Sequence, residues 1–370
     1  MTERHILWGM PVSLYTGKVR SYLLTQGIPF EERLAGPDFI QNVVPNVGRW
    51  IIPVLETPSG DLVQDGAAII DGFEAEAPRA TPDMPVARAV SALFELFGGE
   101  GLLRAAMHYR WSFDDQNLDF IRDEFTLPMQ GVMPPDQIAP FFESSSGRMR
   151  KAGAMFGVST ETAPLVEESY GEFLSLFSAH LAETPFLLGN RPSRGDYGLI
   201  APLYAHLGRD PAPAHLMKRT APRVFRWTER MNRPVVGGGD GDGDGGFRAD
   251  VPDTLKALMR FIADDYLPEL GAHVAFANDW LAKHPDIEPG TNGQDDPTAR
   301  GIGMATFDWR GTQLTTAVMP YRFWLLQKLQ AAAGDDADVR ALFAETGLEA
   351  MLDLKTARPV DRKNHLEVWG

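Results

Sequence analysis

Residues 11–31 read PVSLYTGKVRSYLLTQGIPFE, and this stretch decides the fold of the N-terminal region. It follows a short apolar run, His5 to Trp8, that is typical of a buried strand. From Thr16 the apolar residues recur at helical spacing until Gly27, a residue that commonly ends a helix. A second strand begins at Ile28, so the order of strand, helix and strand predicts a parallel βαβ unit.

A second stretch, residues 51–70, reads IIPVLETPSGDLVQDGAAII and completes this unit. It begins with an apolar run that predicts a buried strand, and Thr57 to Gly60 then form the turn of a hairpin. A helix is expected from Ala67 to Glu74. Residues 1–77 are therefore predicted to form a small α/β domain.

A linker with three prolines, residues 78–85, separates this domain from a region of helical character. Apolar residues there recur every three or four positions, which predicts an all-α domain over residues 86–236. One helix is expected over Leu216 to Met231. Residues 112–158 form an insertion in this domain, and its sequence indicates no particular role.

A low-complexity segment, residues 237–246, reads GGGDGDGDGG and ends the helical domain. Its alternating aspartates resemble the start of a calcium loop, but the twelfth position is Val251 instead of glutamate. We expect a mobile linker that binds no calcium. The extension that follows, residues 247–370, is predicted to be mainly helical, with a hairpin within residues 299–318 and a helix over residues 337–354.

The charge and composition of the chain exclude several classes of function. The 35 basic and 50 acidic residues give a formal charge of −15, which repels nucleic acid and anionic membrane surfaces. The chain has no signal-peptide core and no run of 18 apolar residues, so a cytoplasmic location is expected. It has no cysteine, which excludes disulfides, thiolate metal ligands and a cysteine nucleophile. The eight histidines form no metal-binding motif, so no metal is expected.

Three stretches in order along the chain resemble the signature regions of glutathione transferases. They are residues 11–31, residues 51–70, and residues 185–207, PFLLGNRPSRGDYGLIAPLYAHL. The resemblance covers residues 5–76 closely and residues 160–231 less closely. It implies a thioredoxin-like α/β domain followed by an all-α domain, with glutathione as co-substrate. It also implies a transferase of the detoxification type that joins glutathione to a small apolar electrophile, in a cytosolic protein that forms a homodimer.

The resemblance implies that Ser13 is the catalytic residue of a serine-type member, with its hydroxyl facing the glutathione sulfur. A helix N-terminus and a hydroxyl donor both lower the pKa of a thiol from about 8.5. A lowering of about two units corresponds to about 2.7 kcal/mol of thiolate stabilisation. Tyr15 offers a competing hydroxyl and a further contact to glutathione. The alternative role of Ser13 is a helix cap on Thr16 or Gly17.

Further glutathione contacts are implied by the same resemblance. The backbone of Ile52, beside a cis bond to Pro53, would pair with the cysteinyl unit like an added strand. Asp65 and Gly66 open a helix whose amide groups would bind the γ-glutamyl carboxylate. Gly66 stands where serine is usual. A basic residue is expected just before the strand, but Trp50 and Ile51 stand there, and the basic residue is displaced further back, to Arg49.

The helical domain contributes two more assignments. His108, Tyr109 and Trp111 end a helix that lines the electrophile pocket in the family, and packing in the core is their alternative role. Ser193 and Asp196 match a capping box that opens a helix, which is a structural role.

Two functions remain open after this reading of the chain. The first is a glutathione transferase with Ser13 holding the thiolate. The second is a binding or scaffold protein that keeps the fold without the activity, because Gly66, the displaced basic residue and the long extension all depart from the family pattern.

Overall fold

The computed structural model describes residues 4–234 and 246–370, and its N-terminal region contains a four-stranded sheet with the order β2-β1-β3-β4. Strands β1 and β2 pair in parallel, whereas β3 pairs antiparallel with both β1 and β4. The elements here are β1 (His5–Gly9), α1 (Leu14–Thr25), β2 (Phe30–Leu34), α2 (Pro37–Asn42), α3 (Val44–Val47), β3 (Val54–Glu56), β4 (Leu62–Gln64) and α4 (Gly66–Glu76). The predicted βαβ unit, hairpin and helix are confirmed, and the domain is thioredoxin-like.

Helix α1 is held by its apolar residues between the sheet and the helical domain. Val19, Tyr22 and Leu23 are fully buried, as their helical spacing predicts. Their common core includes Leu7 of the sheet and Leu203 of α10, a helix of the second domain. The two domains therefore share one core, which fixes the N-terminus of α1 relative to the helical domain.

The second domain is helical, as predicted. Its elements are α5 (Pro85–Leu96), the π-helical turn η1 (Phe97–Gly101), α6 (Leu103–Trp111), α7 (Asp114–Thr126), the 3₁₀ turn η2 (Leu127–Met129), α8 (Pro135–Met155), α9 (Ala163–Glu183), α10 (Arg194–Ala205), α11 (Pro211–Thr220) and α12 (Pro222–Met231). Gly98 lets η1 touch α10 and Gly198 lets α10 touch α5, because a side chain on either glycine would overlap the facing backbone. Insertion residues 112–158 supply α7 and α8.

The single helix predicted over Leu216 to Met231 is wrong. Helix α11 ends at Thr220, and α12 begins at Pro222. A proline has no amide hydrogen and disfavours helical geometry in the residue before it, so Ala221 breaks the helix.

The C-terminal extension contains helices and two hairpins. Its elements are α13 (Asp253–Asp265), α14 (Leu267–Lys283), β5 (Gly303–Trp309), β6 (Thr312–Val318), α15 (Pro320–Ala333), α16 (Ala337–Glu345), α17 (Glu349–Asp353), β7 (Val360–Lys363) and β8 (Leu366–Trp369). The predicted hairpin is confirmed as β5–β6. The helix expected over residues 337–354 is divided at Gly347, which has a φ of +76°. The β7–β8 hairpin is an addition that sequence patterns did not indicate.

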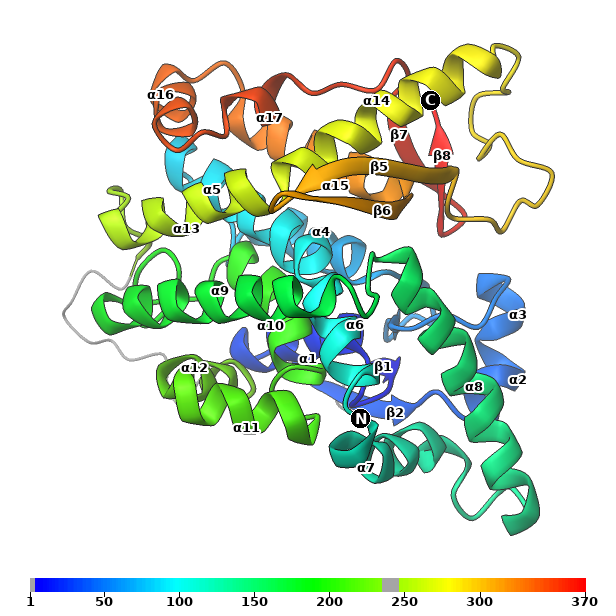
Figure 1. Ribbon diagram of the computed structural model, residues 1–370. Coiled ribbons are helices and arrows are strands. Elements are labelled where there is room, and N and C mark those ends of the chain that lie inside the picture. The colour runs from blue at the N-terminus through cyan, green and yellow to red at the C-terminus, as the bar shows by residue number, and fades with distance from the viewer. Residues whose placement is uncertain (1–3, 235–245) are drawn as a thin grey trace.

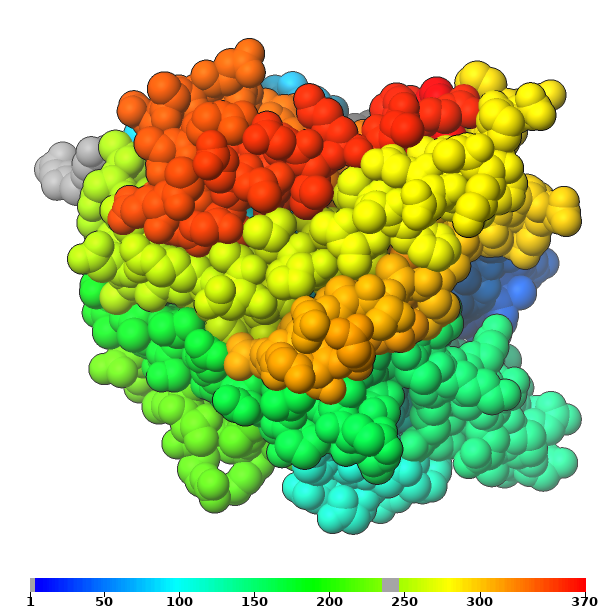
Figure 2. Space-filling model, turned by 45° about the horizontal axis from the view of Figure 1, so that its top comes forward, coloured from blue at the N-terminus to red at the C-terminus, as the bar shows by residue number. Residues whose placement is uncertain are grey.

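The extension lies along the rest of the protein and shares its core. Figure 1 shows α15 beside α5 and α13 beside α9, and both pairs are in contact. Figure 2 shows that residues of the extension, coloured yellow to red, cover much of one face of the molecule. Leu326 and Leu329 of α15 are buried in the same core as Val90 and Leu93 of α5. This shared core places the extension close to the thioredoxin-like domain.

Residues 237–245, most of the predicted Gly/Asp linker, lie outside the described residues, so the expectations of mobility and of no calcium binding stay predictions. Within residues 4–234 and 246–370, no helix is both long and apolar enough to cross a bilayer. The same residues hold no group of three or more His, Cys, Asp or Glu side chains that could bind a metal.

Candidate glutathione site

Ser13 stands at the N-terminus of α1, the position that its predicted role requires. Its side chain accepts a hydrogen bond from the Thr16 amide at 3.3 Å and so caps the helix. A hydroxyl that accepts in this way still has a hydrogen to donate. The side chain is partly exposed. Ser13 therefore combines the cap that the sequence offered as its alternative role with a hydroxyl hydrogen at a helix N-terminus for which the described residues offer no acceptor.

The loop before Ser13 is fixed from the helical domain. Arg110 of α6 donates to the Val12 carbonyl at 3.0 Å, and its guanidinium forms a buried ion pair with Asp210 at 2.7 Å. A charged donor that is itself held by a carboxylate has little freedom to move. Arg110 consequently sets the position of the Ser13 backbone, a role that no local sequence signal indicated.

The hydroxyl of Tyr15 binds a residue of the helical domain. It donates to Glu100 Oε1 at 3.2 Å, and Glu100 on η1 also accepts from Arg322 Nε at 3.1 Å. Burial and the Glu100 carboxylate raise the pKa of Tyr15 well above its usual value, so the hydroxyl stays protonated. The Tyr15 hydrogen is therefore committed to Glu100.

The Ile52–Pro53 bond is cis, as predicted. Within the part of the chain that the structure describes, neither the Ile52 amide nor its carbonyl forms a backbone hydrogen bond. Ile52 packs against the apolar cluster that contains Val12, next to Ser13. A free amide and carbonyl at this point could pair with an extended peptide.

Asp65 and Gly66 begin α4, but the amides of this helix are partly used. Asp65 Oδ1 accepts from the Ala67 amide at 2.9 Å and from the Ala68 amide at 3.1 Å. A Cβ atom on Gly66 would lie 3.3 Å from Lys18 Cδ, so a side chain there would press on a buried ion-paired lysine. Two of the amides at the start of α4 thus already bind Asp65, whereas the Gly66 amide forms no backbone hydrogen bond within the described residues.

The C-terminal extension reaches this site. Arg362 of β7 lies with Nη1 at 3.1 Å from Asp65 Oδ1, and its Nη2 donates to Gln64 Oε1 at 2.8 Å. Arg49 donates from Nη2 to the His365 carbonyl at 2.6 Å. Sequence reasoning missed Arg362 because almost 300 residues separate it from Asp65, and the only signal was the displaced basic residue of the family motif.

The three residues assigned to an electrophile pocket lie together at the end of α6. His108 and Tyr109 are buried, and the Tyr109 ring stacks on Phe113 with centroids 5.3 Å apart. Trp111 is partly exposed and faces Arg150, whose guanidinium lies 4.7 Å from the ring centroid. All three contribute to aromatic packing here, and their contact with an electrophile stays a prediction.

The capping box of α10 is confirmed. Asp196 Oδ2 accepts from the Ser193 amide at 2.8 Å, and its Oδ1 accepts from the Leu187 amide at 3.1 Å. Burial raises the pKa of Asp196 to about 6. Asp196 therefore joins the start of α10 to the preceding loop.

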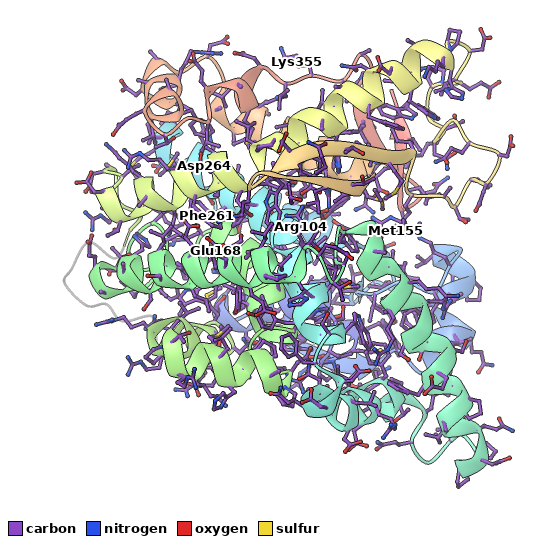
Figure 3. All side chains as sticks on the ribbon, in the orientation of Figure 1. Arg104, Met155, Glu168, Phe261, Asp264 and Lys355 are labelled. Atoms are coloured by element: carbon purple, nitrogen blue, oxygen red, sulfur yellow. The ribbon has the colours of Figure 1, made fainter. Side chains whose placement is uncertain are left out.

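A buried polar network lies between the helical domain and the extension. Glu269 of α14 accepts from Arg104 at 2.6 Å, from Arg322 at 2.7 Å and from Thr316 at 3.0 Å. Figure 3 labels Arg104, which lies where α6 approaches the β5–β6 hairpin. Burial works against the charge of Glu269, but Arg322 and Arg104 outweigh it and lower its pKa to about 2. The network continues through Arg322 to Glu100 and so to Tyr15.

Comparison with known protein families gives a match for the N-terminal domain. Residues 7–81 match the family described as glutathione S-transferase, N-terminal domain. None of the curated protein sequences matches the chain significantly.

Solved structures that match the chain include a glutathione transferase from Phanerochaete chrysosporium, with 17% identity and a TM-score of 0.42 over 62% of this chain and 96% of that one. A beta-etherase from Sphingobium sp. strain SYK-6 has 16% identity and a TM-score of 0.41 over 62% and 94% of the two chains. A glutathione S-transferase from Methylobacterium radiotolerans, in complex with glutathione sulfonate, has 20% identity and a TM-score of 0.38 over 62% and 90%.

Proposed function

We propose that the protein is a glutathione-dependent transferase that activates the glutathione thiol for attack on a small apolar electrophile. The match of residues 7–81 to the N-terminal domain of glutathione S-transferases supports this proposal. The observation that carries this proposal is the Ser13 hydroxyl, which caps α1 and keeps a hydrogen to donate. The free backbone of Ile52 supports it, because it can pair with the cysteinyl unit.

In this proposal the chain activates the thiol by charge stabilisation. The partial positive charge at the N-terminus of α1 favours a thiolate, and the Ser13 hydroxyl donates to the sulfur. Arg110 holds the loop that carries Ser13, while Glu100 keeps the Tyr15 hydroxyl away from the sulfur. Electrophile binding at His108, Tyr109 and Trp111, a cytoplasmic location, a role in detoxification and a homodimer belong to the same proposal.

Calorimetry with glutathione tests the proposal. We expect binding with a dissociation constant in the millimolar range or tighter. The matched control ligand is Glu-Cys-Gly joined by ordinary α-peptide bonds, which has the same composition and a different backbone. No binding of glutathione, or equal binding of both tripeptides, would count against a glutathione site.

One observation favours a second function, that of a binding or scaffold protein without catalysis. Arg362 from the extension contacts Asp65, and Asp65 occupies amides at the start of α4. If these contacts replace the ligand, the protein keeps the fold and binds no glutathione. The same titration separates the two functions.

A further inference from the structure

Two arginines of the extension meet a carboxylate beside Asp65. Arg362 Nε and Arg300 Nε each lie 3.4 Å from an oxygen of Glu367, on β8. Arg300 stands at the end of the loop that precedes β5, and Arg362 also contacts Asp65. Glu367 and Asp65 are both buried, so their charges need these partners.

A third arginine comes from the thioredoxin-like domain. Arg49 donates to the His365 carbonyl at 2.6 Å, and Arg362 donates to the same carbonyl at 3.4 Å. Figure 1 shows β7 and β8, in red, on the same side of the molecule as α2 and α3, in blue. The hairpin thus joins the arginine of one domain to those of the extension.

The cluster carries more positive than negative charge. It contains three guanidinium groups and two carboxylates, namely Arg49, Arg300, Arg362, Asp65 and Glu367. Burial, followed by repulsion from Arg300, lowers the pKa of Arg49. Burial also lowers the pKa of His365, which therefore adds no positive charge at neutral pH. One further carboxylate would balance the cluster.

All three arginines have donors to spare, since Arg362 Nε lies 3.4 Å from Glu367 but forms no hydrogen bond within the described residues. Arg300 is about one-third exposed, at 34%, and among the described residues only its Nε has a polar partner, at 3.4 Å. Arg49 Nε is buried without a hydrogen-bond partner in the described part of the chain. An unpaired buried donor is costly, and a carboxylate is the acceptor that a guanidinium binds best.

The start of α4 shows why such a group is needed. The Ala67 and Ala68 amides donate to Asp65 and are not free for a ligand. A carboxylate that reaches this end of the site lacks these two amides and therefore needs donors from other residues as well. Arg300 and Arg49 have donors to offer, and both lie next to Arg362, the residue that contacts Asp65. Arg300 shares Glu367 with Arg362, and Arg49 shares the His365 carbonyl with it.

We propose that Arg300 and Arg49 form a carboxylate subsite, and that one of the two carboxylates of glutathione binds there. This inference rests on the proposed function. The extension then completes the glutathione site, and Arg300 adds its positive charge to that of Arg49, the displaced basic residue that precedes β3. Arg362 keeps Asp65 and Gln64 in place and positions the subsite.

The test measures affinity for three ligands by calorimetry. They are glutathione, its glycine ethyl ester, and the analogue in which 4-aminobutyrate replaces the γ-glutamyl unit. Each analogue lacks one carboxylate. We expect Arg300→Gln to weaken glutathione binding by about tenfold or more and to leave the affinity for one analogue unchanged. That analogue identifies the carboxylate which binds the subsite.

Two further variants make the result specific. Arg300→Lys keeps the charge and loses the planar pair of donors, so an intermediate affinity is expected. Arg340→Gln removes an exposed arginine of the extension that pairs with Glu349 and Asp353, and glutathione affinity should not change. Melting temperatures of all variants show whether each is folded.

The outcomes show whether the subsite alone is wrong or whether the proposed function is wrong as well. If the wild type binds glutathione and Arg300→Gln binds it equally well, the subsite is wrong and the proposed function stands. If Arg300→Gln weakens all three ligands by the same factor, the residue contacts no carboxylate and the subsite is again wrong. If the wild type binds no glutathione, the proposed function falls and the subsite falls with it.

Discussion

The Tyr15 hydroxyl donates to Glu100 across 3.2 Å, and this bond joins the first turn of α1 to the π-helical turn between α5 and α6. Glu100 is in turn paired with Arg322 of the extension. The side chain next but one to Ser13 is therefore tied into a network that spans both domains and the extension. This arrangement separates the roles of two neighbouring hydroxyls.

Ser13→Ala should raise the pKa of enzyme-bound glutathione and change glutathione affinity by only a few-fold. The hydroxyl acts mainly once the sulfur is charged, whereas affinity comes from the other contacts. Loss of one such hydrogen bond costs about 1.5 to 3 kcal/mol, so turnover at neutral pH should fall about tenfold to a hundredfold. Thiolate absorbance against pH and rates with a generic electrophile measure both effects.

Tyr15→Phe is the matched variant for this measurement. Because the Tyr15 hydrogen is donated to Glu100, its loss should leave the thiol titration nearly unchanged. A titration that moves with Tyr15→Phe and not with Ser13→Ala would transfer the role to Tyr15. If neither variant moves it, the helix N-terminus alone activates the thiol or the protein is no catalyst.

Glu269→Gln should lower the free energy of unfolding by about 3 to 5 kcal/mol, because it leaves two buried guanidinium groups short of a partner. Glu269 is 3% exposed and binds both Arg104 and Arg322. Glu349→Gln is the control, since Glu349 is exposed and solvent screens its pair with Arg340, so that its loss should change the stability little. Urea unfolding measures the free energy of unfolding of both variants. Equal losses in the two variants would show that the buried network of Glu269 stabilises the protein no more than the exposed pair does.

The stability should fall as the pH drops below about 6.5, and His273 should contribute to the slope. Burial, and then Arg322, lowers the pKa of His273 to about 3. Below about pH 6.5, His273 is protonated in the unfolded chain but stays neutral in the folded protein. This difference favours unfolding by up to about 1.4 kcal/mol per pH unit. The stability that neutral His273 gives is present above this range and is lost between about pH 6.5 and 3.

Urea unfolding at several pH values between 7.5 and 5 measures this slope. His273→Asn should be less stable at neutral pH, because the ring accepts from Arg322 at 3.1 Å and bonds Thr316 at 2.8 Å. Its stability should also fall less steeply with acid. His215→Asn changes an exposed histidine and should keep the wild-type slope. An unchanged slope in His273→Asn would show that this histidine is not the titrating group.

We expect a homodimer, and apolar side chains on the thioredoxin-like domain suggest where it forms. Trp50 is 49% exposed and Ile40 is 45% exposed. Light scattering at micromolar concentration should give about twice the chain mass of 40.8 kDa. Trp50→Glu should give monomers, while Val132→Glu, at a residue 64% exposed on the insertion, should not. A wild type of monomer mass would contradict this prediction.

The sequence by itself determined the thioredoxin-like domain and the start of the site. Strand and helix periods, the turn at Thr57 to Gly60 and the capping box at Ser193 are local signals, and local signals decide local structure. They also placed Ser13 at a helix N-terminus, because the chain changes from strand to helix there. Their failures were local too: a proline at 222 and a glycine at 347 broke helices that the apolar period alone would continue.

Only the tertiary structure decided what surrounds Ser13. The bond from Tyr15 to Glu100, the bond from Arg110 to the Val12 carbonyl, and the contact of Arg362 with Asp65 join residues 85 to almost 300 positions apart. Nothing in the spacing of such residues encodes their meeting. They meet because α15 buries its apolar face against α5, and this packing carries the charged β7–β8 hairpin to the first domain.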